Sequence, residues 1–234
     1  MPRLGEALRA VVSDKEEPLE IKGRPESVLM SPTRQKIFEH ICHFPASRLR
    51  AIAKKLNMNT TVVHFHLRKM KQHQYATTFQ VNGKKVYFPF DLRPTEEDLV
   101  SLCILADDAG RELLKNVVDA PGLTASELAS KTHRSAAGTR KIILEMESQS
   151  LVALIVDGRR NRIFPGDGLP RMERRSRQLL RGLKSRLMRR LARDRLSPTI
   201  EMDERRESII ILKVGGRSYR LKIPAETLLP WATS

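Results

Sequence analysis

The spacing of apolar residues after Asn59 is that of a helix with one buried face. Val63, Leu67 and Met70 follow one another at intervals of four and three, which place them on the same side of a helix. Asn59 precedes this run, and its side chain is of the type that accepts a hydrogen bond from a free backbone N–H at a helix N-terminus. The pattern predicts a helix over residues 59–72.

Beyond Gln74 the helical period gives way to two short extended runs. Residues 76–81 and 84–88 are rich in β-branched and aromatic side chains, and they flank Asn82-Gly83. This dipeptide tolerates the positive φ angles of a tight hairpin turn. We expect a β-hairpin, or wing, directly after the helix.

Two further helices are predicted before Asn59. Ser31-Pro32 supplies a capping residue and a proline in the first turn of a helix that ends near Phe44-Pro45. A shorter helix begins at Ala46-Ser47, with Leu49, Ile52, Ala53 and Leu56 on its apolar side. Three helices followed by a wing form a winged-helix module, in which the third helix enters a DNA groove. We therefore predict that helix 59–72 reads DNA while Lys84 and Lys85 contact flanking phosphates.

The sequence repeats itself weakly at an offset of 76 residues. Leu67 then falls on Ile143 and Met70 on Met146, as expected for two copies of one module. Asp157-Gly158 answers the first hairpin turn at an offset of 75, and Phe164-Pro165 answers Phe88-Pro89 at 76. This comparison predicts one additional residue in the second hairpin.

The second copy is expected to contain three helices as well. The first is predicted to be long, from residue 95 to about 118, followed by helices at 124–132 and 135–148. The last part of the chain contains a basic amphipathic helix within residues 170–197, with leucines 180, 183, 187 and 191 in a narrow stripe, and a hairpin with its turn at Gly215-Gly216. The leucine stripe suits packing within the chain or against a second copy, while the basic face suits phosphates or an anionic membrane.

The positive charge is unevenly distributed. The chain has a formal net charge of +16, which favours a polyanionic partner. Residues 31–92 carry 11 basic side chains against Glu39 and Asp91, a net charge of +9, whereas residues 94–169 carry 9 basic and 12 acidic side chains, a net charge of −3. The first copy is thus the predicted DNA reader and the second a support or dimerisation module.

Helix 59–70 (NTTVVHFHLRKM) resembles the third helix of archaeal ArsR-like and MarR-like winged-helix regulators. The resemblance extends to the preceding segment SPTRQKIFEHICHFPASRLRAIAKKLNM and to KKVYFP, reaches the second copy more weakly, and does not include residues 171–234. It implies that His66 faces the core beside Leu67. It also implies a groove-facing side, with His64 in place of the more usual arginine.

Other chemistry is poorly represented. The two cysteines, Cys42 and Cys103, lie in apolar helical patterns and favour a reduced, cytoplasmic protein. No run of about 18 apolar residues is present to span a membrane. His40 and His43 could share a helical face, but there is no metal-binding CxxC or HExxH spacing and no catalytic motif. We expect no enzyme activity, no metal and no cofactor.

The predicted fold class is mainly α with small β wings, an α+β arrangement of two tandem winged-helix modules. The expected regions are an N-terminal arm (1–30), module one (31–92), module two (93–169), the basic helix (170–197) and a C-terminal β-hairpin with tail (198–234). The predicted function is sequence-specific binding of double-stranded DNA by a transcriptional regulator, as a homodimer joined through leucines 180–191 or helix 95–118. A tandem winged-helix scaffold for proteins, or an RNA-binding module, is the alternative.

The predicted contact residues fall into two groups. Those of the first module are Thr60, Thr61, His64, Phe65, Arg68, Lys69, Lys84 and Lys85. Secondary DNA contacts are predicted at Arg140, Lys141, Arg159, Arg160 and Arg162.

Overall fold

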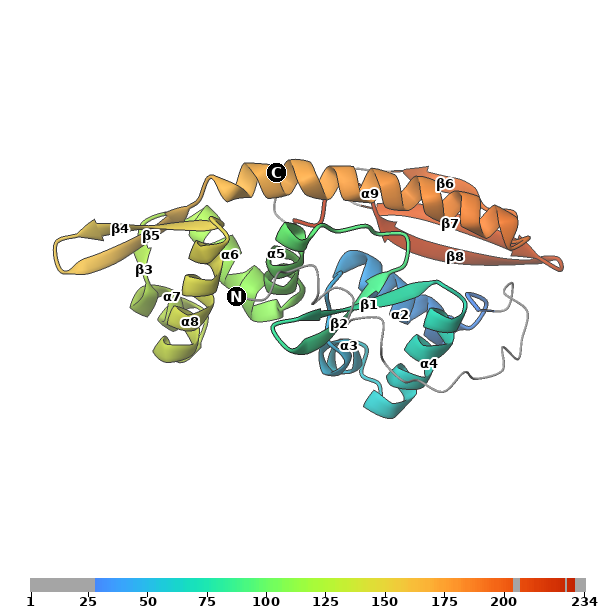
Figure 1. The fold of residues 1–234 in the computed structure, drawn as a ribbon, viewed down its shortest axis with the longest axis horizontal. Coiled ribbons are helices and arrows are strands. Elements are labelled where there is room, and N and C mark those ends of the chain that lie inside the picture. Colours follow the sequence, from blue (N-terminus) through green and yellow to red (C-terminus); the bar gives the residue numbers. More distant parts are fainter. Residues whose placement is uncertain (1–27, 204–206, 226, 230–234) are drawn as a thin grey trace, which may run out of the picture.

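A computed structural model describes residues 28–203, 207–225 and 227–229 of the chain. The predicted arm 1–30 therefore lies almost wholly outside the described residues. Figure 1 shows two lobes side by side along the long axis, the first lobe (residues 28–92) and the second lobe (residues 95–167), with one long helix passing both. The architecture is mixed, with helices and small antiparallel sheets in each part.

The first lobe contains three helices and a hairpin. Its elements are α2 (Pro32–His43), α3 (Leu49–Lys55), α4 (Thr60–Gln72), β1 (Ala76–Val81) and β2 (Lys84–Pro89). Strands β1 and β2 pair antiparallel along their whole length. Asn82 and Gly83 have φ angles of 49° and 70°, the positive values that a two-residue type I′ turn requires.

The second lobe has the same order of elements with additions at its start. It consists of α5 (Glu96–Ala106), α6 (Asp108–Asp119), β3 (Leu123–Thr124), α7 (Ala125–Lys131), α8 (Ala136–Ser148), β4 (Val152–Asp157) and β5 (Arg160–Pro165). The short strand β3 joins the edge of the hairpin, so the sheet has the order β3-β5-β4. Capping boxes at Thr95 and Thr124 fix where α5 and α7 begin.

The single helix predicted over residues 95–118 is wrong, because the chain turns at Asp107. This residue is extended (φ −87°, ψ 131°) and separates α5 from α6. The turn brings residue 110 so close to the Ile104 carbonyl that a Cβ atom there would lie 2.2 Å from the oxygen. Arg111 also donates a hydrogen bond to the Leu105 carbonyl at 2.6 Å. Gly110 is thus the residue that allows the two helices to meet.

A constant offset of 76 residues relates the two lobes. Adding 76 to the bounds of α2, α3, α4, β1 and β2 gives those of α6, α7, α8, β4 and β5 without any adjustment. Left-handed backbone recurs at the same offset, at Asn57 and His133 (both φ 51°) and at Gln74 and Ser150 (φ 56° and 55°). The counterpart of α2 is therefore α6, and α5 is an additional helix of the second lobe.

The additional residue predicted in the second hairpin is absent. Strand β4 pairs with β5 as far as Asp157 opposite Arg160, so the turn is Gly158-Arg159 rather than Asp157-Gly158. Gly158 supplies the positive φ, 60°, at the first turn position. Asp157 is retained in the strand, where its carboxylate accepts a hydrogen bond from Nε of Arg162.

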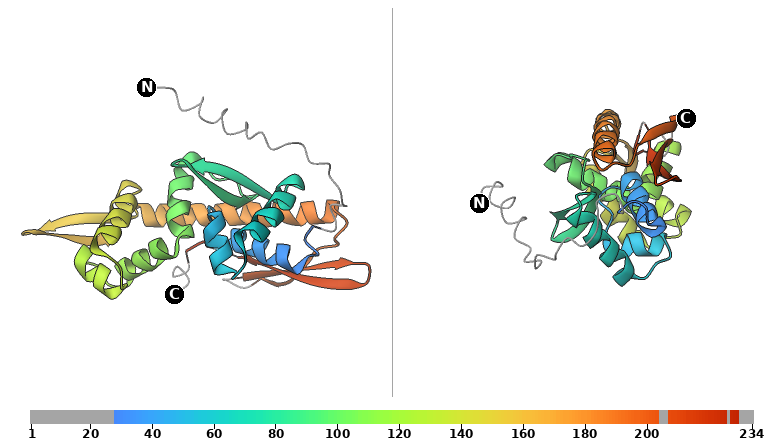
Figure 2. Two further views of the ribbon diagram at one scale, coloured as in Figure 1. Left: turned by 90° about the horizontal axis from the view of Figure 1, so that it is seen from below. Right: turned by 90° about the vertical axis from the view of Figure 1, so that its right-hand side faces the viewer.

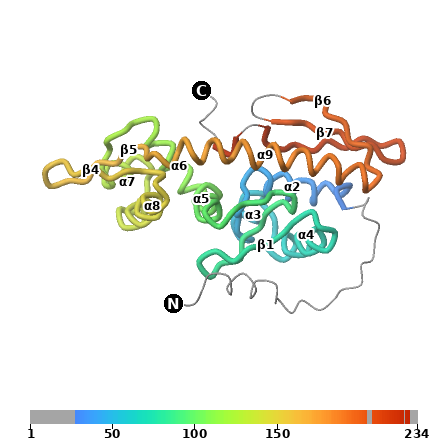
Figure 3. Tube along the Cα trace, turned by 45° about the horizontal axis from the view of Figure 1, so that its top comes forward, coloured from blue at the N-terminus to red at the C-terminus, as the bar shows by residue number. Residues whose placement is uncertain are grey.

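The basic helix predicted at 170–197 is α9 (Gly168–Arg193), which spans the length of both lobes (Figure 1). Figure 3 shows it running from the second lobe alongside the C-terminal sheet. Its apolar stripe is buried within the chain: Leu179, Leu180, Leu183, Leu187 and Leu191 are all less than 5% exposed. These leucines are consequently not free to join two copies, which removes one of the two dimer interfaces predicted from the sequence.

Hydrogen bonds fasten α9 at three points. Arg175 pairs with Asp98 of the second lobe, with Nε 3.0 Å from Oδ2. Arg186 donates to the carbonyl oxygen of Asp91, between the lobes, at 2.9 Å and 2.6 Å. Near its C-terminal end Arg190 lies over the Tyr75 ring of the first lobe, 5.0 Å from the ring centroid. The helix therefore holds both lobes and the segment between them.

Tyr75 is the main anchor of the first lobe on α9. Its hydroxyl donates to Oδ2 of Asp194 at 2.7 Å, and Asp194 is also paired with Arg190 at 3.3 Å. Burial raises the pKa of Tyr75, and the hydrogen bond to Asp194 raises it further. The hydroxyl is thereby kept protonated, as its role as donor requires.

The C-terminal region forms three strands rather than two. They are β6 (Thr199–Asp203), β7 (Glu207–Val214) and β8 (Arg217–Pro224), in the order β6-β7-β8, and β6 was not predicted from the sequence. Gly215 and Gly216, both with positive φ, form the turn between β7 and β8. The sheet packs on α2, and Glu39 of that helix accepts a hydrogen bond from the Lys222 backbone N–H at 2.8 Å. This region is thus an integral part of the first lobe's surroundings.

Candidate nucleic-acid interface

Helix α4 begins at a well-formed cap and buries one face. The Asn59 side chain accepts a hydrogen bond from the Thr61 backbone N–H at 2.8 Å. Val63, Leu67 and Met70 are completely buried against the rest of the first lobe. The apolar stripe therefore fixes which side of α4 faces solvent.

The solvent face of α4 contains most of the predicted contact residues. Thr60, Thr61, His64 and Phe65 are exposed, and Phe65 has 53% of its surface accessible. Arg68, one turn further along, is half-buried, as is the neighbouring Lys69. The structure thus places hydroxyl, imidazole, aromatic and guanidinium groups along one exposed face of a helix.

His66 lies at the boundary between the two faces. It is half-buried rather than fully in the core, and its ring lies 5.3 Å from that of Phe65 in an edge-on arrangement. Burial lowers the pKa of His66, and the nearby Arg34 lowers it further. His66 is thereby kept largely neutral and packs more than it contacts solvent.

The first wing projects toward the second lobe. Asn82 and Lys84 at its tip line a crevice of about 690 Å³ with Lys141 and Glu145 of α8 and with residues of α5. Lys84 is exposed, and Lys85 on the other side of the strand is half-buried. Any phosphate that Lys84 contacts must therefore lie near the junction of the lobes, which the sequence did not indicate.

The crevice also contains Cys103 from α5. Burial raises the pKa of its thiol to about 11, so the side chain is a neutral thiol at physiological pH. Cys42 is fully buried in the first lobe. Among the residues that the structure describes, no group of three His, Cys, Asp or Glu side chains is arranged to hold a metal ion.

Helix α8 occupies in the second lobe the position of α4 in the first. Ser135 caps it by accepting a hydrogen bond from the Gly138 backbone N–H at 3.2 Å, and Ile143 and Met146 face the core. Its solvent face differs in chemistry, because small and apolar residues replace the polar ones of α4. The residues at the positions of Thr60, Thr61, His64, Phe65 and Arg68 are Ala136, Ala137, Arg140, Lys141 and Leu144.

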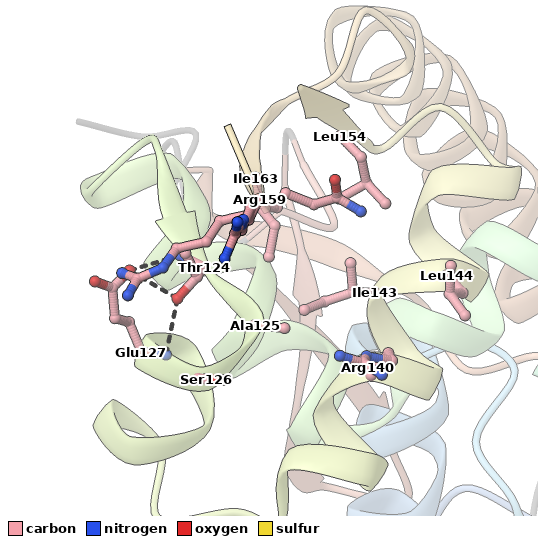
Figure 4. Close-up of a pocket in the computed structure, with 12 residues that line it drawn as sticks. Thr124, Ala125, Ser126, Glu127, Arg140, Ile143, Leu144, Leu154, Arg159 and Ile163 are labelled. Carbon is pink, nitrogen blue, oxygen red and sulfur yellow. Dashed lines mark hydrogen bonds between the residues drawn. The ribbon is translucent and has the colours of Figure 1, made fainter. Parts of the chain in front are cut away.

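A hollow of about 510 Å³ lies between α7, α8 and the second wing. Figure 4 shows Thr124 and Glu127 on one side of it and Arg140 and Leu144, both from α8, on the other. Thr124 donates its backbone N–H to Glu127 at 2.7 Å, and this hydrogen bond is the main reason why the pKa of Glu127 is lowered. The hollow thus has a negative side at α7 and a positive side at α8.

The five predicted secondary contacts do not all remain available. Arg140, Lys141, Arg159 and Arg160 are exposed. Arg162 is half-buried, pairs with Asp157 and donates to the Gly122 carbonyl at 3.0 Å. The hydrogen bond from Asp157 raises the pKa of Arg162. Arg162 therefore has a structural role in the hairpin, while the other four point toward solvent.

No described helix is long and apolar enough to cross a membrane. The positive charge of α9, which the sequence placed beside that of α4, divides in the structure between bonds to the lobes and a solvent face. Sequence periodicity identified the leucines of α9 but could not show that Arg175, Arg186 and Arg190 would bind residues 77 to 117 positions away.

Comparison with known proteins gives one similar sequence and one similar structure. Over 67 residues the chain is 28% identical to an uncharacterized HTH-type transcriptional regulator of Methanocaldococcus jannaschii. The match includes 29% of this chain but only 17% of the regulator's length. Reduced HlyU from Vibrio cholerae is similar in structure, with a TM-score of 0.28 and 17% identity over 41% of this chain and 87% of HlyU. No protein-family model matches the sequence.

Proposed function

We propose that this protein is a transcriptional regulator that binds double-stranded DNA, with two winged-helix modules in tandem of which the first reads the sequence. The first lobe and the second lobe are these modules. The similarity to a protein described as an HTH-type transcriptional regulator supports the class. The observation that carries the proposal is the exposed face of α4.

That face has the chemistry of a base-reading helix. The methyl groups of Thr60 and Thr61 and the ring of Phe65 suit contact with thymine methyl groups, because they are exposed apolar groups beside hydrogen-bonding ones. Arg68 can offer two parallel donors to guanine O6 and N7. No acidic residue occurs between Thr60 and Gln72, so nothing on α4 repels phosphate.

Phosphate contacts then set the orientation of α4. Lys69 lies on the same helix, and Lys84 and Lys85 lie on the wing, so these cations flank the exposed face. Each cation that neutralises a phosphate releases a counterion and makes binding weaken with salt. The net charge of +9 over residues 31–92 supports this part of the proposal.

The second lobe has a supporting role in the proposal. Arg140, Lys141, Arg159 and Arg160 give its helix and wing a few phosphate contacts. However, Leu144 replaces Arg68 and is 51% exposed, which leaves the middle of α8 without a base-reading group. We assign it non-specific contacts that extend the footprint of the first lobe.

Titration of the full chain against duplex DNA at several salt concentrations tests the proposal. Fluorescence anisotropy should show affinity falling steeply with salt, and footprinting should show protection of discrete genomic sites. The triple variant R68A/K84A/K85A should lose both the protection and much of the affinity. The matched control K131A/K213A/R217A removes three exposed cations elsewhere and should retain the protection. A flat salt response, or equal loss in both triple variants, would overturn the proposal.

One observation favours a second candidate function, a scaffold for protein partners or an RNA-binding module. Ile155 and Val156 on β4 are 53% and 75% exposed, an apolar pair at the far end of the second wing. Apolar side chains so placed suit a protein surface better than phosphates. In the same titration, a scaffold would show no site protection, and an RNA-binding module would prefer duplex or single-stranded RNA to DNA.

Whether two copies associate is part of the proposal. We propose a homodimer, as is usual for winged-helix regulators, but not through the leucines of α9, which are buried within the chain. The second predicted interface, a continuous helix 95–118, does not exist because of the break at Asp107. Sedimentation equilibrium with and without DNA distinguishes a dimer from a monomer that uses its own two lobes.

A further inference from the structure

Helix α9 has two opposite faces with different partners. Because an α-helix turns by about 100° per residue, the buried leucines and the exposed arginines of α9 lie on opposite sides of its axis. The inward face is fully used: Arg175, Arg186 and Arg190 flank the leucines and bind the lobes. The outward face has no such use within the fold.

The outward face carries an arginine stripe, defined here as five exposed residues. They are Arg171, Arg174, Arg181, Arg189 and Arg193. Within the described ranges, none of the five forms a hydrogen bond or an ion pair. The one acidic residue of α9, Glu173, is paired instead with Arg177.

Intramolecular packing does not account for the arginine stripe. Arg189 and Arg193 are four residues apart, and like charges at this spacing repel one another and destabilise a helix. The leucine face alone would hold α9 in place with any polar residues opposite. A row of unpaired guanidinium groups is what a polyanion-binding surface requires.

The arginine stripe lies on the side of the molecule away from the reading helix. Figure 1 shows α9 along the top and α3, α4, α7 and α8 below, and the end view in Figure 2 shows the same layering, with α9 and the C-terminal sheet above the lobes. A duplex on α4 therefore leaves the stripe unoccupied. The 22 residues from Arg171 to Arg193 rise about 33 Å, close to one turn of B-DNA.

We propose that the arginine stripe of α9 binds the phosphate backbone of a second segment of duplex DNA, independently of its sequence. The protein then holds two duplex segments on opposite sides. This goes beyond the proposed function and does not depend on α4 reading any particular sequence.

An anionic membrane is the competing partner for a basic helix. Helices that lie on membranes insert an apolar face between the lipids in addition to their electrostatic attraction. In α9 that face is covered by the two lobes, since Leu183, Leu187 and Leu191 are at most 1% exposed. The geometry therefore favours a linear polyanion over a lipid surface.

The test compares the full chain with two triple variants. R174Q/R181Q/R189Q neutralises the centre of the arginine stripe, and K131Q/K213Q/R217Q removes the same charge at other exposed positions. The probe is a 30-base-pair duplex without a preferred site, titrated over a salt series. The slope of log K against log salt should fall by about 2.7 in the stripe variant, about 0.9 for each lost phosphate contact, and by less than 1 in the control.

A capture experiment identifies the second duplex. Wild-type protein should retain a labelled duplex on beads that carry an immobilised duplex, and the stripe variant should bind the beads but lose the labelled duplex. Equal slopes or equal capture in the two triple variants would overturn the inference, as would unchanged duplex binding with lost binding to phosphatidylserine vesicles. The variant R68A/K84A/K85A should still show the stripe-dependent slope, so failure of the proposed function is seen separately.

Discussion

The two lobes have the same backbone and different surfaces. Tyr75 and Leu151 donate their backbone N–H to Met70 and Met146, at 2.8 Å and 2.9 Å, in the same turn after the third helix. At the solvent face, by contrast, His64 corresponds to Arg140 and Arg68 to Leu144. Positions that bury apolar groups have kept their character, whereas positions that face solvent have not. The comparison teaches that any difference in function between the lobes must lie on their exposed faces.

Equivalent core positions should cost the same in both lobes, and this is the largest expected effect. Leu67→Ala and Ile143→Ala each remove a side chain that is at most 2% exposed. Each should lower the free energy of unfolding by about 2–5 kcal/mol, through lost burial and a cavity. Urea denaturation followed by circular dichroism measures both. A loss in one lobe alone would show that the shared backbone does not imply shared packing.

Acid should act on the first lobe through a group that the second lobe lacks. His40 is buried, forms a contact of 3.2 Å with Oγ of Ser47 and corresponds to Asn116. Burial lowers the pKa of His40 to about 4, and Arg111 lowers it further. The unfolded histidine binds a proton near pH 6.5, so stability should fall as pH decreases from about 6.5 to 4, by up to about 3 kcal/mol.

Measurements of unfolding free energy across this pH range, on wild type and His40→Gln, test the effect. The variant should lose less stability on acidification because it cannot take up the proton. Parallel curves for the two proteins would place the acid sensitivity elsewhere.

The reading faces should respond unequally to the same change. Arg68→Ala should weaken binding to a protected site by about 1–3 kcal/mol, since a base contact is lost. Leu144→Ala at the equivalent position of α8 should change affinity by less than about 0.5 kcal/mol. Anisotropy titration at fixed salt compares them directly. If Leu144→Ala were the more damaging change, the second lobe would be the reader.

Helix caps offer a smaller and reciprocal exchange. Thr124 caps α7 with its side chain, whereas its counterpart Arg48 makes no capping hydrogen bond at the start of α3. Thr124→Ala should therefore destabilise the protein by about 1 kcal/mol, while Arg48→Thr should stabilise it by a similar or smaller amount. Thermal melts measure both variants, and an unchanged melting temperature for Thr124→Ala would remove the cap from the account.

Local patterns predicted the elements of the first lobe well. The cap at Asn59, the spacing of Val63, Leu67 and Met70, and Asn82-Gly83 all act over a few residues, and each is found where the sequence placed it. The break at Asp107 was missed because apolar residues continue across it with helical spacing. Its cause is the close approach of Gly110 to Ile104, a contact that no periodicity records.

Features that depend on distant residues were not predictable. Strand β6 is short and largely exposed, and it exists because it pairs with β7. The proximity of the first wing to α8 and the division of the α9 arginines into inward and outward sets follow from how the lobes meet. Among the candidate site residues, sequence placed the face of α4 but could not show that Lys84 lies beside the second lobe or that Arg162 is held by Asp157.

The anchoring of the first lobe to α9 has a consequence for how the chain acquires its structure during synthesis. Tyr75 and Asp194 are 119 residues apart. At about 5–20 residues per second, the ribosome needs roughly 6–24 s to make the intervening chain. Throughout that interval the first lobe stands without the helix that covers it, although the whole second lobe has been made. The earliest part of the molecule to be translated is thus among the last to be completed, and it is the part most in need of chaperones while it waits.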